Sequence, residues 1–383
     1  MKKIKVVHHA KTVGYSGTDR TAQIFAKYLA QSERFQPYLL YREGDAANTR
    51  LDIAREWLGE DYVIGYGWEP GEQGRQSPYI PEKSNLEKQL SKIDPDIVHV
   101  HRSGYAEWPG FRHMAPRAKW VETNIFGEAD QSPEPQIDAN LYVSEYVQNR
   151  ALGNGNPEGF VLFNPVEEPI LPMTPENREF CRQQLLSRFK LPENAILLGR
   201  VGRADNFDPI SLNAFVEVEQ RCPEAFYLVV DPCQSWIDTA ERLGIKNIRF
   251  IDPVSDDMEL SNFYRGLDIY AHARHDGETF GVSLAEAMMH RVPVVSHESA
   301  IHNGQSEIIG NAGFVVPFAD HIAYRDVLLG LIDNPELATE DEKSRVRLRD
   351  HFGLEGRRRA MRHFESSCVV SRLARIYDWV LAQ

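Results

Sequence analysis

Short apolar runs alternate with amphipathic segments along the first part of the chain. Apolar runs bounded by turn residues are typical of the buried strands of a parallel sheet. Helical periodicity appears between them, in a segment through Ile24, Phe25 and Leu29 that Thr18 or Asp19 can cap. This alternation predicts parallel sheets with crossover helices. The expected strands are residues 4–8, 37–41, 97–100, 120–123 and 139–144, and further helices are expected at 86–93 and from 145 onwards.

A stretch with three prolines, residues 163–172, separates this series from a second one. Such a stretch is a stiff connection rather than a helix or strand, so a domain boundary is expected there. The last helix, residues 369–381, carries apolar side chains at helical spacing and therefore buries one face. The second series has expected strands at 195–201, 227–230, 248–250, 269–270, 292–295 and 313–316.

Composition fits a globular protein of two domains. The 383 residues are 42% hydrophobic and 26% charged. No apolar run approaches the ~20 residues that a membrane helix needs, and the N-terminus lacks the apolar centre of a signal peptide. The four cysteines are widely separated, as is typical of reduced thiols. We therefore expect a cytoplasmic protein without a transmembrane segment.

The charge balance limits the classes of ligand that the protein is expected to bind. A net charge of -13 argues against general nucleic-acid binding, which depends on neutralising phosphates. An anionic ligand would need a local group of cations and backbone donors. The run Arg357-Arg358-Arg359, with Arg362 beyond, has two interpretations: a solvated helix face, which we favour, or a contact with phosphate or with a membrane surface.

The most informative stretch runs from His275 to Ser296. It places Glu278 and Glu286 on either side of a Phe280-Gly281 turn that opens an apolar helix. A turn of this kind presents free backbone N–H groups and a positive dipole end, which suits a phosphate. An acid inside the helix can reach a ribose hydroxyl, and an acid before it can reach sugar hydroxyls. The alternative is a surface acid followed by an amphipathic helix packed behind a strand.

This stretch resembles the Glu-x7-Glu signature of the family 4 glycosyltransferases, which are retaining enzymes of the GT-B type. The resemblance implies an α/β fold with two facing Rossmann-like, doubly wound domains and an interdomain cleft. Residues 1–165 would form the acceptor-side domain, with the C-terminal helix 366–383 packing back on it. Residues 166–365 would form the nucleotide-sugar-binding domain. The matching positions are Glu278, Phe280-Gly281, Glu286-Ala287-Met288 and Pro293-Val294-Val295.

The resemblance also implies roles in donor binding. Glu286 would bind the ribose, and Glu278 would bind the donor sugar and stabilise the developing cation. The amides of Gly281 and Val282 would bind the diphosphate, and Phe280 belongs to the same nucleotide-sugar-binding set. No cofactor and no metal are expected, because fixed donors take the place of a metal. The chain also shows no His-x-x-x-His, no clustered cysteines and no supported Asp-x-Asp.

A second motif, Gly199 to Asp208, resembles the family's Gly-Arg-x4-Lys element. Arg203 stands in the Arg position, and its fork can bond two phosphate oxygens at once. The alternative for Arg203 is an ion pair with a nearby carboxylate. Asp208 stands in the Lys position, where a carboxylate would repel a diphosphate. Either Asp208 turns away, or another cation such as Arg274 or His275 compensates.

Two features of the first domain extend the resemblance. Asn124 stands where the family usually has a His near the transferred sugar; it can bond a hydroxyl but cannot act as a general base. In the retaining family the leaving phosphate takes the acceptor proton, so Asn124 remains a candidate catalytic residue. His99 and His101 either line the same cleft or are structural. Gly14 and Gly17 resemble the family's Gly-Gly-x-Glu-Arg loop near phosphate and acceptor, where glycine permits close approach.

Three functions follow from these patterns. The first is a retaining glycosyltransferase that moves a sugar from a nucleoside-diphosphate sugar to a glycan or another hydroxyl acceptor, as in polysaccharide biosynthesis. The second is a nucleotide-sugar-binding protein with little or no transferase activity, because the usual Lys and His are both replaced. The third is an isomerase such as a nucleotide-sugar 2-epimerase. The sequence leaves the sugar, base, acceptor, linkage and oligomeric state open, along with a peripheral membrane contact.

Overall fold

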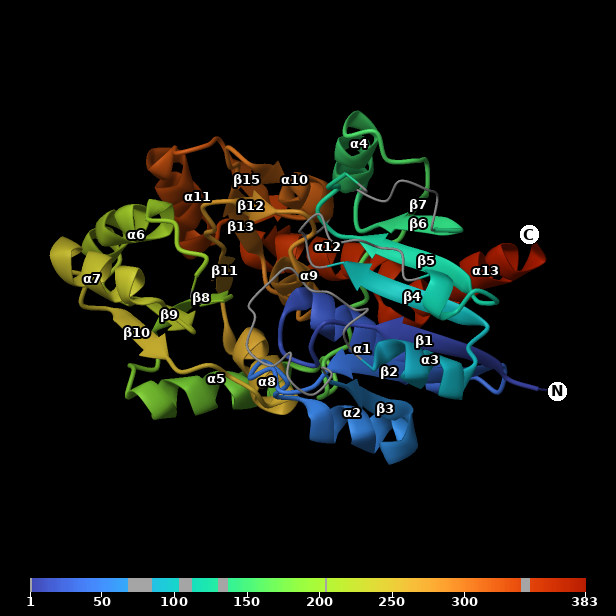
Figure 1. Ribbon diagram of the computed structural model, residues 1–383. Helices are drawn as coiled ribbons and strands as arrows, with labels where there is room; N and C mark the ends of the chain where they lie inside the picture. Colours follow the sequence, from blue (N-terminus) through green and yellow to red (C-terminus); the bar gives the residue numbers. More distant parts are fainter. Residues whose placement is uncertain (1, 68–84, 103–111, 130–136, 204, 339–344) are drawn as a thin grey trace. The chain divides into compact units, whose positions relative to one another are not determined.

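The computed structural model describes residues 2–67, 85–102, 112–129, 137–203, 205–338 and 345–383. The chain forms two compact units, Met1–Pro165 with Ser366–Gln383, and Val166–Glu365. Each unit is an α/β structure around its own parallel sheet (Figure 1). The assignment of an acceptor to the first unit and a nucleotide sugar to the second stays a prediction.

Unit 1 is built on a seven-stranded sheet with the order β3-β2-β1-β4-β5-β6-β7. The strands expected from the apolar runs are all present, and β3, β7 and the helix α2 are additional. The strands are β1 (Ile4–His9), β2 (Phe35–Arg42), β3 (Val63–Tyr66), β4 (Ile97–Arg102), β5 (Lys119–Asn124), β6 (Ala139–Tyr142) and β7 (Phe160–Val161). The helices are α1 (Gly17–Ala30), α2 (Leu51–Leu58), α3 (Leu86–Ile93), α4 (Glu145–Gly153) and α13 (Ser366–Ala382), with short 3-10 turns η1 (Glu60–Tyr62) and η3 (Arg112–Met114).

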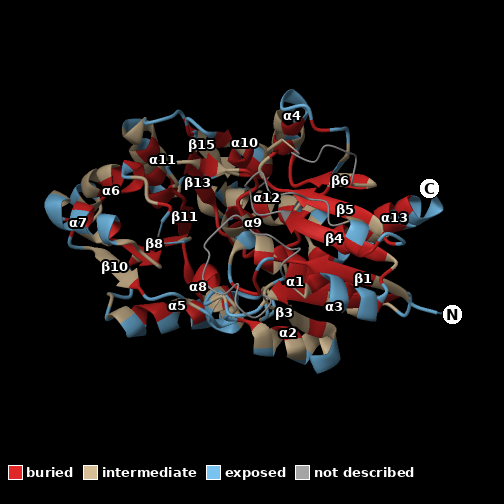
Figure 2. Cartoon of the chain, in the orientation of Figure 1, coloured by how far each residue is buried: buried red, intermediate tan, exposed pale blue. Residues whose placement is uncertain are grey.

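The last helix, α13, completes the core of unit 1. Leu373 and Tyr377 pack in one apolar cluster with Phe25 of α1 and Val121 of β5. The burial expected from the helical spacing of the C-terminal segment is thus confirmed, and Figure 2 shows the central strands of this sheet as buried.

The prediction that Thr18 or Asp19 is the N-cap of helix α1 is wrong. The helix begins at Gly17, and its cap is Ser16, whose hydroxyl accepts from the backbone N–H of Asp19 at 3.2 Å. Thr18 and Asp19 therefore lie in the first turn. Asp19 is buried, and its carboxylate accepts a hydrogen bond from Thr12.

Unit 2 is built on a six-stranded sheet with the order β10-β9-β8-β11-β13-β15. The chain order runs in opposite directions from β8, so the carboxyl ends of β8 and β11 form the switch point at which doubly wound folds bind ligands. Its strands are β8 (Ile196–Val201), β9 (Ala225–Val230), β10 (Ile248–Ile251), β11 (Ile269–Ala271), β12 (Gly277–Glu278), β13 (Val294–His297), β14 (His302–Asn303), β15 (Phe314–Val316), β16 (Glu336–Ala338) and β17 (Arg345–Arg347). Its helices are α5 (Pro175–Phe189), α6 (Ile210–Arg221), α7 (Gln234–Leu243), α8 (Asp257–Gly266), α9 (Val282–Met289), α10 (Gly304–Ile309), η4 (Gly310–Ala312), α11 (His321–Asp333) and α12 (Leu348–His363).

The arginine run on α12 is divided: Arg357 and Arg359 are half-buried, whereas Arg358 and Arg362 are exposed. Arg357 donates to the carbonyl oxygen of Met289 at 2.6 Å, and Arg359 donates to that of Ile308 at 2.7 Å. These two side chains therefore hold the ends of α9 and α10, and the solvated-face interpretation is wrong for them. Arg358, whose side chain is 65% exposed, does face solvent.

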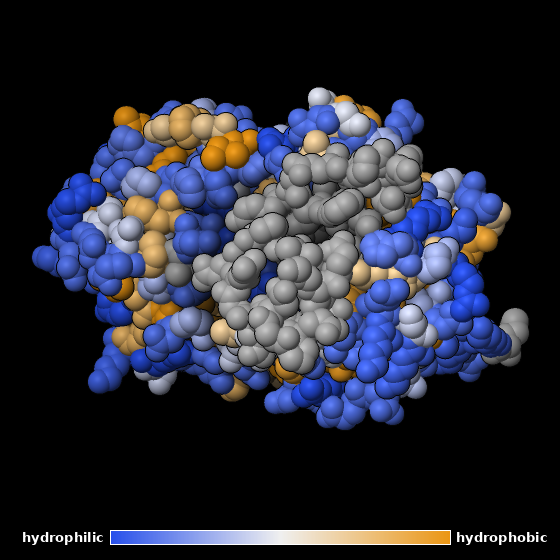
Figure 3. Space-filling view, viewed as in Figure 1, coloured by the Kyte–Doolittle hydropathy of each residue, from blue (hydrophilic) through white to orange (hydrophobic). Residues whose placement is uncertain are grey.

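The coloured part of the face shown in Figure 3 is mostly hydrophilic, with separate apolar areas. Within the described part of the chain, no helix has both the length and the apolar character needed to cross a bilayer. The cytoplasmic location stays a prediction.

Candidate functional site

The site lies at the carboxyl ends of β8 and β11 in unit 2. The chain leaves β11 at Ala271, forms a polar loop from His272 to Gly281, and then enters α9. The predicted residues Glu278, Phe280, Gly281, Val282 and Glu286 are all brought together here. The connections that follow β8 and β11 run to opposite sides of the sheet, and loop residues gather at the switch point between them.

Gly277 fixes the backbone just before Glu278. Its φ is 67°, and a Cβ there would lie 1.9 Å from the carbonyl oxygen of His302. Gly277 and Glu278 form β12, which pairs with β14, and Gln305 accepts from the Glu278 N–H at 3.1 Å. The position of Glu278 is therefore set by the backbone, not by a free loop.

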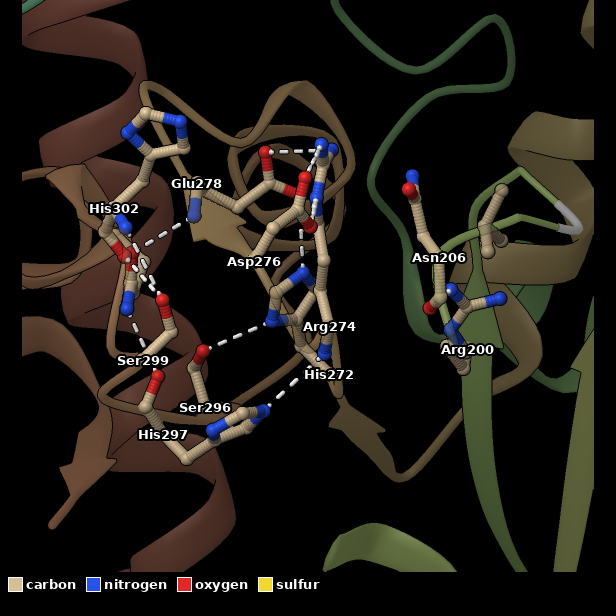
Figure 4. A network of polar contacts seen from close by, with 12 residues as sticks. Arg200, Asn206, His272, Arg274, Asp276, Glu278, Ser296, His297, Ser299 and His302 are labelled. Carbon is tan, nitrogen blue, oxygen red and sulfur yellow. Dashed lines mark hydrogen bonds and ion pairs between the residues drawn. The ribbon is translucent and has the colours of Figure 1, made fainter. Parts of the chain in front are cut away.

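The Glu278 carboxylate lies in a group of charges shown in Figure 4. Oε1 is 3.1 Å from Nε2 of His272, and Oε2 is 3.3 Å from Nη1 of Arg274. Arg274 also binds Asp276, with 2.9 Å between Nη2 and Oδ2. Burial acts to raise the pKa of Glu278, but the Arg274 charge and the His272 hydrogen bond outweigh it, so the pKa lies below its usual value. Glu278 is therefore ionised at neutral pH.

The turn before α9 is made by Phe280 and Gly281. Phe280 is buried against Phe364, with ring centroids 5.3 Å apart. Gly281 has φ of 89° and is the N-cap of α9, and no side chain among the described residues caps that helix. The amides that follow, beginning at Val282, thus belong to a helix start available to an anion.

Glu286 lies in the second turn of α9. The buried hydroxyl of Tyr264 donates to its Oε2 at 2.9 Å. The burial and the adjacent carboxylate raise the pKa of Tyr264, so this hydroxyl stays a donor. Tyr264 therefore fixes the orientation of Glu286, a contact that the sequence does not reveal.

Arg203 and Arg200 differ sharply in environment. The side chain of Arg203 is 60% exposed and pairs with Asp205 at 3.1 Å, the alternative considered for it from the sequence. Arg200 is 2% exposed and lies over the ring of Trp236, with 4.9 Å between Cζ and the ring centroid. Nη2 of Arg200 donates to the carbonyl oxygen of Asn206 at 2.8 Å, whereas its Nε and Nη1 have no partner in the described structure.

Arg200 is thus a site residue that the sequence analysis missed. In Figure 4 it lies with Asn206 across from the group of His272, Arg274 and Glu278. A buried guanidinium with unbonded N–H groups is costly unless an anion binds it. The signal was available: Arg200 falls inside the expected apolar strand 195–201, where a charge is unusual.

Asp208 has a local partner. Its Oδ1 accepts from the backbone N–H of Ile210 at 2.8 Å, at the start of α6. Of the two suggested compensating cations, Arg274 already binds Asp276 and Glu278, and the side chain of His275 is 56% exposed.

In unit 1 the predicted residues have local contacts. Asn124 is buried at the end of β5; its Oδ1 accepts from Gly127 N–H at 2.9 Å and its Nδ2 donates to the Glu128 carbonyl at 3.0 Å. It therefore holds the following turn. A Cβ at Gly14 would lie 2.4 Å from the carbonyl oxygen of Ala47, so this glycine permits packing between loops, and Gly17 begins α1.

Three buried histidines lie side by side on β1 and β4, because His8 and His99 pair across the sheet and His101 follows on the same face. One ring nitrogen from each lies within 4.8 Å of the others, so the group has the composition of a metal site. His99 bonds Tyr377 and Thr123 at 2.7 and 2.8 Å, which supports its structural interpretation.

The bonding of the other two histidines weighs against a metal. Nδ1 of His8 and Nε2 of His101 lie 3.0 Å apart, and their outer nitrogens have no partner in the described structure. A metal between the facing nitrogens would make both outer nitrogens buried N–H donors without acceptors. Metal-bound histidines normally donate that proton to a second group, so the histidine group carries no metal assignment.

Comparison with known proteins supports the resemblance. Residues 192–334 match the family described as "Glycosyl transferases group 1". A phosphatidyl-myo-inositol mannosyltransferase of Mycobacterium leprae is 31% identical over 199 residues, 51% of this chain and 49% of that protein. The chain therefore spans about half the length of that relative.

Solved structures resemble the whole chain in fold. A glycosyltransferase from Rickettsia africae has a TM-score of 0.72 at 18% identity, and the superposition covers 100% of this chain and 99% of the Rickettsia chain. Anabaena HepE in complex with UDP and glucose has a TM-score of 0.72 at 16% identity, covering 98% and 99%. The resemblance seen in the sequence is confirmed to this extent: residues 192–334 are similar to the group 1 glycosyltransferases, and the chain has the two Rossmann-like domains of the GT-B fold.

Proposed function

We propose that this protein is a retaining glycosyltransferase that transfers a sugar from a nucleoside-diphosphate sugar to a hydroxyl acceptor. The observation that carries the proposal is the arrangement at the switch point of unit 2. An open helix start, two oriented carboxylates and a buried arginine with unbonded N–H groups lie around one end of the sheet. The donor class is also supported by the UDP and glucose bound in HepE, a protein of the same fold.

In this proposal the diphosphate is bound by the first amides of α9 and by Arg200. The helix start supplies N–H groups and the positive dipole end, and the buried guanidinium supplies a full charge. Arg203 takes a lesser part, because its exposed side chain already pairs with Asp205. Glu286, held by the Tyr264 hydroxyl, accepts from the ribose hydroxyls.

Glu278 acts on the sugar side of the diphosphate. As an ionised carboxylate it accepts from sugar hydroxyls and stabilises positive charge that develops at the anomeric carbon. Fixed N–H donors meet the charge of the leaving diphosphate, so the reaction is proposed to need no metal. The acceptor proton is proposed to pass to the leaving phosphate, so no general base is needed at the position of Asn124, whose polar atoms hold the turn after β5.

The test is a donor-binding and transfer assay across a panel of nucleoside-diphosphate sugars. Glu286→Gln should weaken donor binding about tenfold or more, since it replaces a hydrogen bond to a charged group. Glu241→Gln, an exposed acid on α7, is the matched control and should bind as the parent does. Parental transfer rates in both Glu286→Gln and Glu278→Gln would contradict the site.

The second candidate is a nucleotide-sugar-binding protein with little or no turnover. Two observations favour it: Asp208 is bound at the start of α6, and both polar atoms of Asn124 hold a turn. Calorimetry with the donor, followed by transfer and hydrolysis assays, separates the candidates. Tight binding with no turnover on a broad acceptor panel would favour the second.

A further inference from the structure

His272 connects Glu278 to the sheet. It follows β11 directly and is 3% exposed. Its Nε2 lies 3.1 Å from Oε1 of Glu278, and its Nδ1 lies 2.9 Å from the hydroxyl oxygen of Ser296 on β13. The carbonyl oxygen of His272 accepts from the buried hydroxyl of Tyr324 at 2.9 Å. His272 is therefore held by hydrogen bonds at both ring nitrogens and at its backbone carbonyl oxygen.

The bonding fixes the tautomer of His272. An ionised carboxylate only accepts hydrogen bonds, so Nε2 must carry the proton that points to Glu278. In a neutral ring Nδ1 then holds a lone pair, which accepts from the Ser296 hydroxyl. Burial lowers the pKa of His272, more strongly than the nearby Glu278 raises it, so the ring is neutral at physiological pH. Each polar atom in the series of hydrogen bonds from Ser296 through His272 to Glu278 therefore acts either as donor or as acceptor.

The surroundings of the pair are also defined. Arg274 and Asp276 face Glu278 from the same loop, and Arg200 and His297 act on His272 from β8 and β13. The backbone N–H of Arg274 donates to Nε2 of His297 at 3.2 Å, so that ring's Nδ1 donates to the Glu298 carbonyl. His297 thus supports the loop backbone, and His272 contacts the carboxylate itself.

We infer that His272 is a positioning residue: its Nε2–H orients the Glu278 carboxylate and keeps it ionised for work on the donor sugar, with Ser296 locking the tautomer. The inference rests on the proposed function of Glu278. Arg274 supplies the charge that favours ionisation, but it is shared with Asp276 and bonds only Oε2. His272 alone of these contacts fixes Oε1, so the direction of the carboxylate depends on it.

The first test measures Glu278 directly in the full chain. Carbon-13 NMR of labelled glutamate carboxyls, with Glu278 assigned through Glu278→Gln, follows its titration. His272→Phe removes the donor, and the pKa of Glu278 should rise; His272→Gln offers an amide N–H and should restore part of the effect. Ser296→Ala should give a smaller rise in the same direction. An unchanged Glu278 titration in both His272 variants would overturn the inference.

A control separates this role from the general loss of a buried histidine. His290, also buried in unit 2, bonds Ser261 and a backbone carbonyl but no carboxylate. His290→Phe should lower stability and leave the Glu278 titration unchanged. If His272→Phe does not fold, His272→Gln decides the test by comparison with the parent.

The second test measures catalysis. In His272→Phe the acid limb of kcat/KM should move to higher pH, so that the ratio of activity at about pH 5 to that at about pH 8 falls about tenfold, the loss expected for one hydrogen bond to an ionised group. His272→Gln should recover part of that loss. A uniform loss at every pH would indicate a structural role only. A parent with no transferase activity would refute the proposed function, and the NMR result would still decide the role of His272.

Discussion

Replacement of Arg200 by methionine tests the donor site most sharply, because it should separate binding from stability. Methionine keeps much of the side-chain volume over Trp236 and removes the guanidinium. Arg200 is 2% exposed, and its Nε and Nη1 have no partner in the described structure. In the proposed donor complex, each of these N–H groups makes a charge-assisted bond to phosphate.

The magnitude follows from those groups. Hydrogen bonds to charged groups contribute about 1.5–3 kcal/mol each, so two bonds lost to a diphosphate should weaken donor binding by at least about a hundredfold. The free protein loses one bond to Asn206 and the contact with Trp236, but it no longer buries an incompletely bonded charge. Its free energy of unfolding should therefore change by less than about 1 kcal/mol or rise, as when buried ionic groups are replaced by apolar ones.

Isothermal calorimetry with the donor and urea unfolding of the free protein measure the two quantities. Arg203→Ala is the matched control, and it should change the donor Kd less than about threefold because an exposed ion pair contributes about 0–1 kcal/mol. Parental donor affinity in Arg200→Met, together with lost affinity in Arg203→Ala, would refute this reasoning and restore Arg203 as the diphosphate ligand.

Three further predictions concern single positions. Asp208→Ala should lower the free energy of unfolding by about 1 kcal/mol in urea titration, because the carboxylate accepts from the Ile210 N–H at the start of α6. Asp208→Asn should keep this hydrogen bond and lie within about 0.5 kcal/mol of the parent; a tighter donor Kd in Asp208→Asn would show that the charge faces the phosphates. Gly281→Ala should cost about 1–2 kcal/mol in the same assay, since φ is 89° and the new Cβ would lie 2.8 Å from Cδ1 of Leu284; parental stability would contradict that backbone. Glu278 has a folded pKa below its unfolded value of about 4.3, so its stabilisation is present above that pH and is lost as the pH falls through the folded pKa. Glu278→Gln should flatten the stability curve on the acid side of that unfolded value, and an unaltered curve would show that the carboxylate is not stabilised in the fold.

The edge strands β3 and β7 were not predicted, whereas the other strands of the two large sheets could be predicted because apolar runs between turn residues report burial directly. The same holds for α13, whose apolar side chains recur at helical spacing and pack into unit 1. The cap of α1 was placed wrongly because Ser16, Thr18 and Asp19 are all good capping residues, and only the backbone decides which of them precedes the helix.

The carboxylates and the helix start could likewise be predicted, since they lie close together in sequence. Arg200 was missed because two Gly-Arg pairs follow one another, and burial alone distinguishes Arg200 from the exposed Arg203. Tyr264 and Ser296 come from other parts of unit 2, and only the folded chain brings them to Glu286 and to His272. Contacts between distant segments of this kind leave no local pattern in one sequence.

The central claim is transfer with retention by fixed protein donors. Its most direct test is proton NMR of the product formed from a nucleoside-diphosphate sugar in the presence of excess EDTA. The account predicts a product whose anomeric configuration is that of the donor, formed at the same rate with and without the chelator. A product of inverted configuration, or transfer abolished by EDTA and restored by a divalent cation, would contradict it.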